Sequence, residues 1–130
     1  MKTNRCIIIA RKIFDYFGSY YHPWYRYKDV RRFLFLYDLF KKIPMEGDIV
    51  ECGVGEGRSV VAFGAFVRHE DKNRMVIGYD TFEGFPYGDK KGYFFVSIEK
   101  VQKTLMYHGV QNVVSLVKGP FEETLPHYDG

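Results

Sequence analysis

The apolar residues of the first third of the chain follow a helical period. Between Val30 and Phe40 they recur at intervals of three and four residues, which places them on one face of a helix. This pattern predicts a helix over residues 29–42, with Asp29 as its N-terminal cap. An earlier helix is expected over residues 5–17. An aromatic segment, residues 20–27, separates the two, and its role stays open between a substrate lid, a contact between subunits and an anchor for the first helix.

From residue 47 onward, short apolar runs alternate with helical patterns. Strands are expected over residues 49–52, 75–79 and 112–117, and helices over residues 59–68 and 94–107. Alternation of strands and helices at these lengths is typical of a parallel sheet. We therefore predict an α/β fold: a Rossmann-like, doubly wound parallel sheet with strand order 3-2-1 that stops before a fourth strand. Residues 1–46 would form an N-terminal helical segment, and residues 47–130 a partial Rossmann-like domain.

Composition narrows the class of protein. The 130 residues amount to one domain, and 46% hydrophobic residues are enough for a core. With 19 basic and 16 acidic residues the net charge is only +3, so a nucleic-acid partner is not expected. No apolar run approaches membrane-spanning length, so no membrane partner is expected either. The two cysteines, Cys6 and Cys52, indicate no disulfide framework and favour the cytoplasm, with Cys52 a small buried apolar residue of the first strand.

A glycine-rich turn follows the first predicted strand. Glu51 precedes three glycines at alternate positions, Gly53, Gly55 and Gly57, and a helix start comes next. Glycine lets a ligand approach the backbone, and the first N–H groups of a helix favour an anionic group. The spacing differs from the dinucleotide fingerprint, which needs a glycine three residues after the second, and no phosphate-binding Gly-Lys-Ser or Gly-Lys-Thr occurs. The pattern E-x-G-x-G-x-G resembles the first motif of class I S-adenosylmethionine-dependent methyltransferases.

Acidic and aromatic residues follow the strand ends, where ligands of open α/β sheets bind. Glu51 would face a ligand ammonium group, or else serve a structural partner. Asp80 follows the second strand and would accept both ribose hydroxyls; the alternative is that it caps a turn. Phe82 would either pack against adenine or enter the core. After the third strand, Gly119 and Phe121 would offer a close backbone approach and an aromatic face, or form a plain turn.

Three blocks tie these residues to one family. Residues 47–54, 78–86 and 118–126 resemble consecutive blocks of the macrocin O-methyltransferase family, and the segment Asp80-Thr81-Phe82-Glu83-Gly84-Phe85-Pro86 is the most specific of them. The resemblance spans about residues 31–126. It implies methyl transfer from S-adenosylmethionine to a hydroxyl of a small molecule or sugar. The cofactor-binding positions on this reading are Glu51, Gly53, Val54, Gly55, Gly57, Arg58, Ser59, Asp80, Thr81, Phe82, Gly119 and Phe121.

The chain also departs from the family pattern. Gly55 and Glu56 stand where relatives have an aromatic and a basic residue, and the family's later Asp-x-Asp metal motif is not seen before Gly130. The resemblance therefore implies an N-terminal, cofactor-binding part that is incomplete for catalysis, with catalytic residues unknown. Mg²⁺ would bind in a full-length relative, through ligands outside this chain. The four histidines lack metal-ligand spacing, so no metal site is expected here.

Other hypotheses stay open beside the methyltransferase. One is a non-catalytic module that binds S-adenosylmethionine or a nucleotide, or that serves only for interaction; another is a nucleotide- or dinucleotide-dependent enzyme, which the glycine spacing disfavours. A homo-oligomer is also open. Without a fourth strand, the strand over residues 49–52 would present an apolar edge, so we expect this stretch to self-associate or to be poorly soluble.

Overall fold

The computed structural model describes residues 27–42, 47–70 and 73–128. The predicted helix over residues 5–17 and most of the aromatic segment 20–27 lie outside this part. The chain divides into two compact units, Met1–Leu36 and Tyr37–Gly130, and the boundary falls within helix α2 (Tyr27–Lys42). Because α2 begins at Tyr27, the prediction that Asp29 caps it is wrong: Asp29 lies inside the helix.

Three parallel strands form the sheet. They are β1 (Ile49–Cys52), β2 (Val76–Asp80) and β3 (Val114–Lys118), in the order β1-β2-β3. Ile49 pairs with Val76, and Val76 pairs with Val114, so all three strands run together to one carboxyl edge. The α/β class and the parallel sheet are confirmed. The doubly wound arrangement, with further strands beyond β1, stays a prediction.

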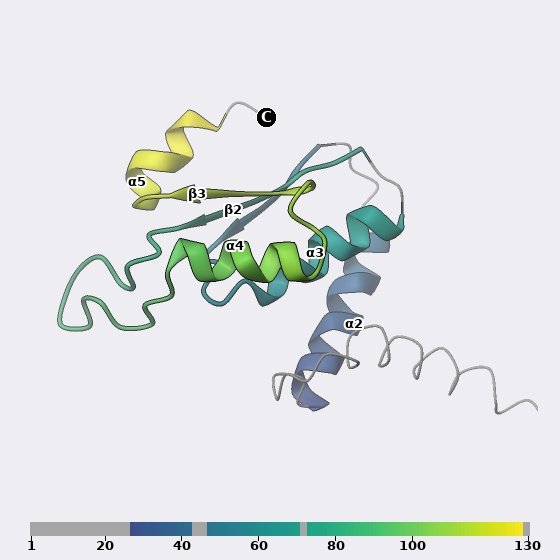
Figure 1. Cartoon of the computed structure of the whole chain (residues 1–130), viewed down its shortest axis with the longest axis horizontal. Coiled ribbons are helices and arrows are strands. Elements are labelled where there is room, and N and C mark those ends of the chain that lie inside the picture. The colour runs from purple at the N-terminus through teal and green to yellow at the C-terminus, as the bar shows by residue number, and fades with distance from the viewer. Residues whose placement is uncertain (1–26, 43–46, 71–72, 129–130) are drawn as a thin grey trace, which may run out of the picture. The chain divides into compact units, whose positions relative to one another are not determined.

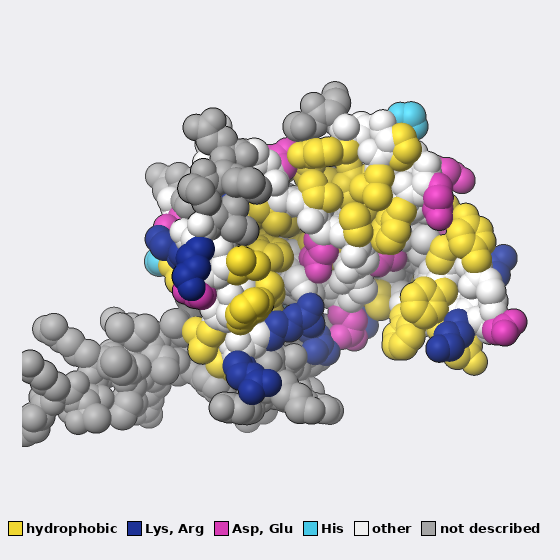
Figure 2. Space-filling model, turned by 180° about the vertical axis from the view of Figure 1, so that it is seen from behind, with side chains coloured by type: hydrophobic (Ala, Val, Ile, Leu, Met, Phe, Trp, Pro, Cys, Tyr) yellow, Lys and Arg dark blue, Asp and Glu magenta, His cyan; other side chains and the backbone are white. Residues whose placement is uncertain are grey.

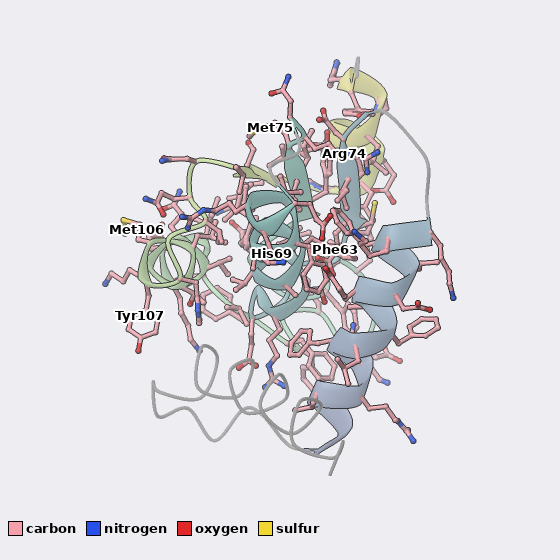
Figure 3. All side chains as sticks on the ribbon, turned by 90° about the vertical axis from the view of Figure 1, so that its right-hand side faces the viewer. Phe63, His69, Arg74, Met75, Met106 and Tyr107 are labelled. Atoms are coloured by element: carbon pink, nitrogen blue, oxygen red, sulfur yellow. The ribbon has the colours of Figure 1, made fainter. Side chains whose placement is uncertain are left out.

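Two helices cover one face of this sheet. Helices α3 (Arg58–His69) and α4 (Ile98–Tyr107) lie together on the lower side of the sheet in Figure 1. In Figure 3, which looks along the strands, Met106 and Tyr107 point away from the sheet at the last turn of α4, and both are exposed. Short α5 (Phe121–Thr124) and the 3-10 turn η1 (Leu125–His127) follow β3 and turn back above the sheet.

Glycines let α3 approach the sheet closely. A Cβ on Gly64 of α3 would lie 2.7 Å from Cγ2 of Val114, and one on Gly78 of β2 would lie 2.6 Å from Cγ2 of Val54. Both separations are too short for real atoms, so these positions need glycine for packing. The valines at this interface are buried, and they form the centre of the core together with Val60.

The carboxyl-terminal part of α2 belongs to the second unit and packs on α3. The rings of Tyr37 and Phe40 lie 5.0 and 5.7 Å from that of Phe66. Tyr37 donates a 2.7 Å hydrogen bond to Glu70, and Lys41 pairs with the other carboxylate oxygen at 2.8 Å. The hydrogen bond to Glu70, followed by burial, raises the pKa of the Tyr37 phenol. This network anchors the end of α2 at the end of α3.

Cys52 was predicted to be buried, but it lies on a face of the sheet that is exposed at this end of β1. Strand residues alternate between faces, and Val50 and Cys52 share the face opposite α3. Cys52 is exposed and Val50 is 39% exposed. The prediction failed because an apolar strand residue is buried only where another element covers its face of the sheet. No described element covers this face at the end of β1.

The start of α4 also differs from the prediction of residues 94–107. Phe94 has φ of +60°, which takes it out of the helix, and α4 begins only at Ile98. Ser97 is the cap: its side chain accepts the N–H of Lys100 at 3.3 Å. The sequence prediction extended an apolar run through residues that belong to a loop.

Candidate functional site

The glycine turn at the end of β1 has three residues in the left-handed region. Gly53, Gly55 and Gly57 have φ of +92°, +52° and +83°, conformations that other L-residues rarely adopt. The turn is closed by a 3.0 Å hydrogen bond from the N–H of Gly57 to the carbonyl of Val54. Gly57 then caps α3. The turn therefore delivers the first turn of α3 to the carboxyl edge of the sheet, as the sequence predicted.

The glycines differ in what surrounds them. A Cβ on Gly57 would lie 2.9 Å from Cγ1 of Val101 in α4, so this glycine faces the helix layer. A Cβ on Gly53 or Gly55 would meet no atom of the described residues within 4 Å. Two of the three glycines thus border open space at the carboxyl edge, which is where a ligand can approach the backbone, and the third is required for packing.

Asp80 joins the end of β2 to this turn. Its Oδ2 atom accepts the N–H groups of Val54 at 2.9 Å and Gly55 at 3.0 Å, while Oδ1 accepts that of Phe82 at 2.8 Å. The Thr81 hydroxyl is 3.5 Å from Oδ1 but donates its single proton to Gly84 at 2.6 Å. The bond to Phe82 is the turn-capping alternative of the sequence analysis. The contacts to Val54 and Gly55 were not anticipated.

The segment after Asp80 is a tight, cross-linked turn. Thr81 donates to the carbonyl of Gly84 and accepts the N–H of Glu83 at 3.2 Å. Glu83 pairs with Lys118 at the end of β3 at 2.8 Å. The hydrogen bond to Lys118, reinforced by its charge, lowers the pKa of Glu83, and the same bond raises the pKa of Lys118. Both side chains are largely exposed, so the pair orders the loop more than it stabilises the fold.

Phe82 occupies the core. It is 2% exposed and has φ of +54°, a conformation unusual for a non-glycine residue. Of the two alternatives for Phe82, the structure shows burial, so its ring offers no face to a ligand. The turn geometry that directs Phe82 inward is the one that lets its N–H reach Asp80.

A hollow of about 580 Å³ opens between the ends of β2 and β3. Its lining residues are Thr81, Glu83, Phe85, Pro86, Tyr87, Lys91, Gly92, Lys118, Gly119 and Pro120. The outer wall is the β2–α4 loop, which projects at the left in Figure 1 and at the right in Figure 2, where it carries hydrophobic side chains with basic ones beside them. Backbone hydrogen bonds Phe85 to Tyr93 (3.0 Å) and Gly92 to Phe85 (2.9 Å) close the base of this loop.

The remaining predicted positions are spread around the turn. Glu51 lies on the face of β1 that α3 covers, as pairing with Gly78 requires, and its Oε2 atom is buried. Arg58 pairs with Glu56 at 2.8 Å. Phe121 is partly exposed at the start of α5, beside the hollow-lining segment that ends at Pro120. Glu51 thus lies on the face of the sheet that carries the helices, and its contact with a ligand ammonium group stays a prediction.

Within residues 27–42, 47–70 and 73–128, no three His, Cys, Asp or Glu side chains gather closely enough to hold a metal ion. None of the helices in this part of the chain is both long and apolar enough to span a membrane.

The family follows from a direct comparison. The model of the macrocin-O-methyltransferase (TylF) family matches residues 30–130, which is most of the chain. The chain belongs to this family. The three blocks that suggested the resemblance all fall inside the matched region, and so do the glycine turn and Asp80.

Solved structures of methyltransferases share the fold. The O-methyltransferase NovP matches with a TM-score of 0.69 at 23% identity, covering 77% of this chain and 49% of NovP. The calicheamicin methyltransferase CalS11 matches with a TM-score of 0.66 at 28% identity, covering 79% of this chain and 49% of CalS11. The chain therefore spans about half the length of these relatives. No curated protein sequence matches significantly.

In this TylF-family chain, the sequence analysis did not anticipate that the aromatic residues of the β2–α4 loop are exposed, two of them (Phe85 and Tyr87) at the hollow. Phe85, Tyr87, Tyr93, Phe94 and Phe95 are between 45% and 79% exposed. The density of aromatic residues in this stretch, together with glycines at positions 84, 88 and 92, was the available signal. Residues 81–89 were predicted to form a loop, but the following helix was predicted to begin at Phe94, which assigned Phe94 and Phe95 to that helix instead of to the loop.

Proposed function

We propose that this chain is the cofactor-binding portion of an S-adenosylmethionine-dependent O-methyltransferase. The observation that carries the proposal is the open space beside Gly53 and Gly55, at a turn that Asp80 fastens to the end of the neighbouring strand. Membership of the TylF family supports the reaction class, because the family and its solved relatives are methyltransferases.

The order of the strands suggests how the cofactor would lie. The methionine part would contact the backbone of Gly53 to Gly57 and the first turn of α3, where Arg58 and Ser59 begin the helix and its N-terminal dipole favours a carboxylate. The ribose would lie at Asp80. The adenine ring would enter the hollow between β2 and β3, near Gly119.

The hollow fits a flat aromatic base. Phe85 and Tyr87 supply aromatic surface, and Thr81 and Lys118 supply polar groups at its inner edge. This assignment replaces Phe82, whose ring is buried, with Phe85 and Tyr87 as the candidate aromatic contacts. Phe121 is a further candidate at the margin of the hollow.

The bound cofactor would supply an electrophilic methyl group on its sulfonium. The acceptor would be a hydroxyl of a small molecule or a sugar; the relative CalS11 is described as a TDP-rhamnose 3′-O-methyltransferase. Groups that deprotonate or orient that hydroxyl, and any Mg²⁺ ligands, are not assigned to the residues described. We also propose a cytoplasmic enzyme without nucleic-acid or membrane partners, whose assembly into a homo-oligomer is left to measurement.

Calorimetric titration with S-adenosylmethionine and S-adenosylhomocysteine tests cofactor binding. Gly53→Ala should weaken binding about tenfold or more, equivalent to about 1.4 kcal/mol or more, because its Cβ would occupy the ligand side of the turn. Gly47→Ala is the matched control: Gly47 has φ of +109° and no atom of the described chain within 4 Å of a Cβ, but it precedes β1 at the opposite edge.

Binding that survives Gly53→Ala as well as it survives Gly47→Ala would remove the turn from the site. Absence of binding by the unaltered chain, while inorganic phosphate or adenosine nucleotides bind, would instead favour a nucleotide-binding module.

A further inference from the structure

Asp80, the last residue of β2, holds the glycine turn with its side chain. A carboxylate oxygen carries two lone pairs, and both lone pairs of Oδ2 are directed to N–H groups of the glycine turn, those of Val54 and Gly55. Oδ1 accepts one N–H, from Phe82. One acceptor position therefore remains on Oδ1, which is too few for Asp80 to accept two ribose hydroxyls while it holds the turn.

The bonds to the turn join neutral backbone donors to a charged acceptor. Hydrogen bonds from backbone N–H groups to a carboxylate are charge-assisted, and they are shorter and stronger than those between neutral groups. They also span 25 and 26 residues of sequence, so they link the ends of β1 and β2 in addition to the β1–β2 ladder and the packing of Val54 on Gly78. Without them, the turn would be attached at Gly53, whose N–H donates to Tyr79 at 2.8 Å, and at Gly57.

We propose that Asp80 is a positioning residue for the glycine turn, and that cofactor affinity depends on it mainly through that turn. The proposal rests on the proposed cofactor site and deepens it. Asp80 fixes the backbone that would contact the methionine part of the ligand, which Asp80 itself does not reach, and it offers at most one oxygen position to the ribose.

The test combines one variant with two ligands. In Asp80→Asn, one neutral oxygen replaces two charged ones, so the N–H groups of the turn and of Phe82 compete for a single acceptor, and any bond that the turn keeps loses its charge assistance. Asp48→Asn is the control: Asp48 also accepts a backbone N–H, from Met75 at 3.0 Å, at the amino edge of the sheet, and the asparagine oxygen can keep that single bond. The ligands are S-adenosylhomocysteine and its 2′-deoxy analogue, titrated by calorimetry into the full chain.

If Asp80 is a positioning residue, Asp80→Asn should lower the affinity for both ligands by the same factor. Asp80→Asn should weaken S-adenosylhomocysteine about tenfold, and the deoxy analogue by the same factor within about twofold, because unconnected contributions add. A direct ribose contact predicts coupling instead: the analogue, lacking the hydroxyl, would lose little on substitution. That result would overturn the proposal.

Hydrogen exchange in the ligand-free chain gives a readout that does not involve the cofactor. The amides of Val54 and Gly55 should exchange about tenfold or more faster in Asp80→Asn than in the unaltered chain, and Asp48→Asn should leave them unchanged. Unchanged exchange in Asp80→Asn would refute the positioning role. If the unaltered chain binds no S-adenosylhomocysteine, the proposed function fails, and the exchange rates still decide the role of Asp80.

The unaltered chain supplies a second measurement should Asp80→Asn fail to fold. Saturation with S-adenosylhomocysteine should leave the Val54 and Gly55 amides at least as protected as before, since Asp80 keeps both bonds. Faster exchange of these two amides on binding would mean that the ribose displaces the turn from Asp80, which contradicts the proposal.

Discussion

Alanine substitutions at Gly57 and Gly53 separate packing from backbone strain. Gly57→Ala places a residue with a side chain at φ of +83°, which costs about 1–2 kcal/mol. Its Cβ would also lie 2.9 Å from Cγ1 of Val101, a fully buried residue of α4 that cannot move into solvent. Overpacking of this kind costs about 1–3 kcal/mol, so the total loss of stability is about 2–5 kcal/mol. Gly53→Ala should lose only the stability that backbone strain costs, about 1–2 kcal/mol.

Urea denaturation of both variants, followed by circular dichroism at low micromolar concentration, measures the difference. With a slope of about 1–3 kcal/mol per molar urea, the midpoint of Gly57→Ala should fall on the order of 1–2 M, and that of Gly53→Ala by less than about 1 M. The double variant Gly57→Ala/Val101→Ala isolates the contact: shortening Val101 should recover about 1–3 kcal/mol relative to additive losses. Equal midpoints for the two single variants, or additive losses in the double variant, would refute the assignment of Gly57 to packing.

Three further outcomes follow from the same contacts. Lys118→Met should raise the pKa of the Glu83 carboxyl back toward the ordinary value of a glutamate side chain. The stabilisation by this pair is fully present above that ordinary pKa and is lost as pH falls through the lower pKa of the folded state. A carbon-detected NMR titration that shows the same Glu83 pKa in both chains would contradict this. Tyr37→Phe should cost about 1 kcal/mol in urea denaturation by removing the hydrogen bond to Glu70. A loss of the same size in a Glu70→Ala background, which has no acceptor, would exclude that bond as the cause. Val50→Lys should reduce self-association of the chain, measured by light scattering, because it places a charge on the exposed face of the edge strand. Equal self-association of the variant and the unaltered chain would mean that the chains associate through another surface.

The strands could be predicted closely because their signals are local. The run 49–52 is bounded by Gly47 and Gly53, and β1 has those bounds in the structure. The predicted third strand was two residues early, since Val113 belongs to a turn that its N–H closes on Val110 at 3.0 Å. Short-range spacing carries little information about such turns.

Burial and long-range hydrogen bonds could not be predicted in this way. Cys52 and Val54 are both apolar neighbours of Gly53, yet Cys52 is exposed and Val54 is buried against Gly78. Which face of β1 is covered depends on where α3 lies, and that is decided by packing between segments distant in the chain. The same holds for Asp80, whose partners in the glycine turn come together only in the folded sheet.

The segment that carries the family resemblance most specifically is accounted for largely by structure. Phe82 fills the core, Thr81 and Gly84 close the turn, and a Cβ on Gly84 would lie 2.5 Å from the carbonyl oxygen of Tyr93. Even Asp80 uses its carboxylate oxygens mainly to accept backbone N–H groups of the fold. A segment whose residues have structural tasks identifies a fold without showing that a ligand binds. The functional claim therefore rests on the open space beside Gly53 and Gly55, which no described atom fills, and Gly53→Ala tests it with a single methyl group.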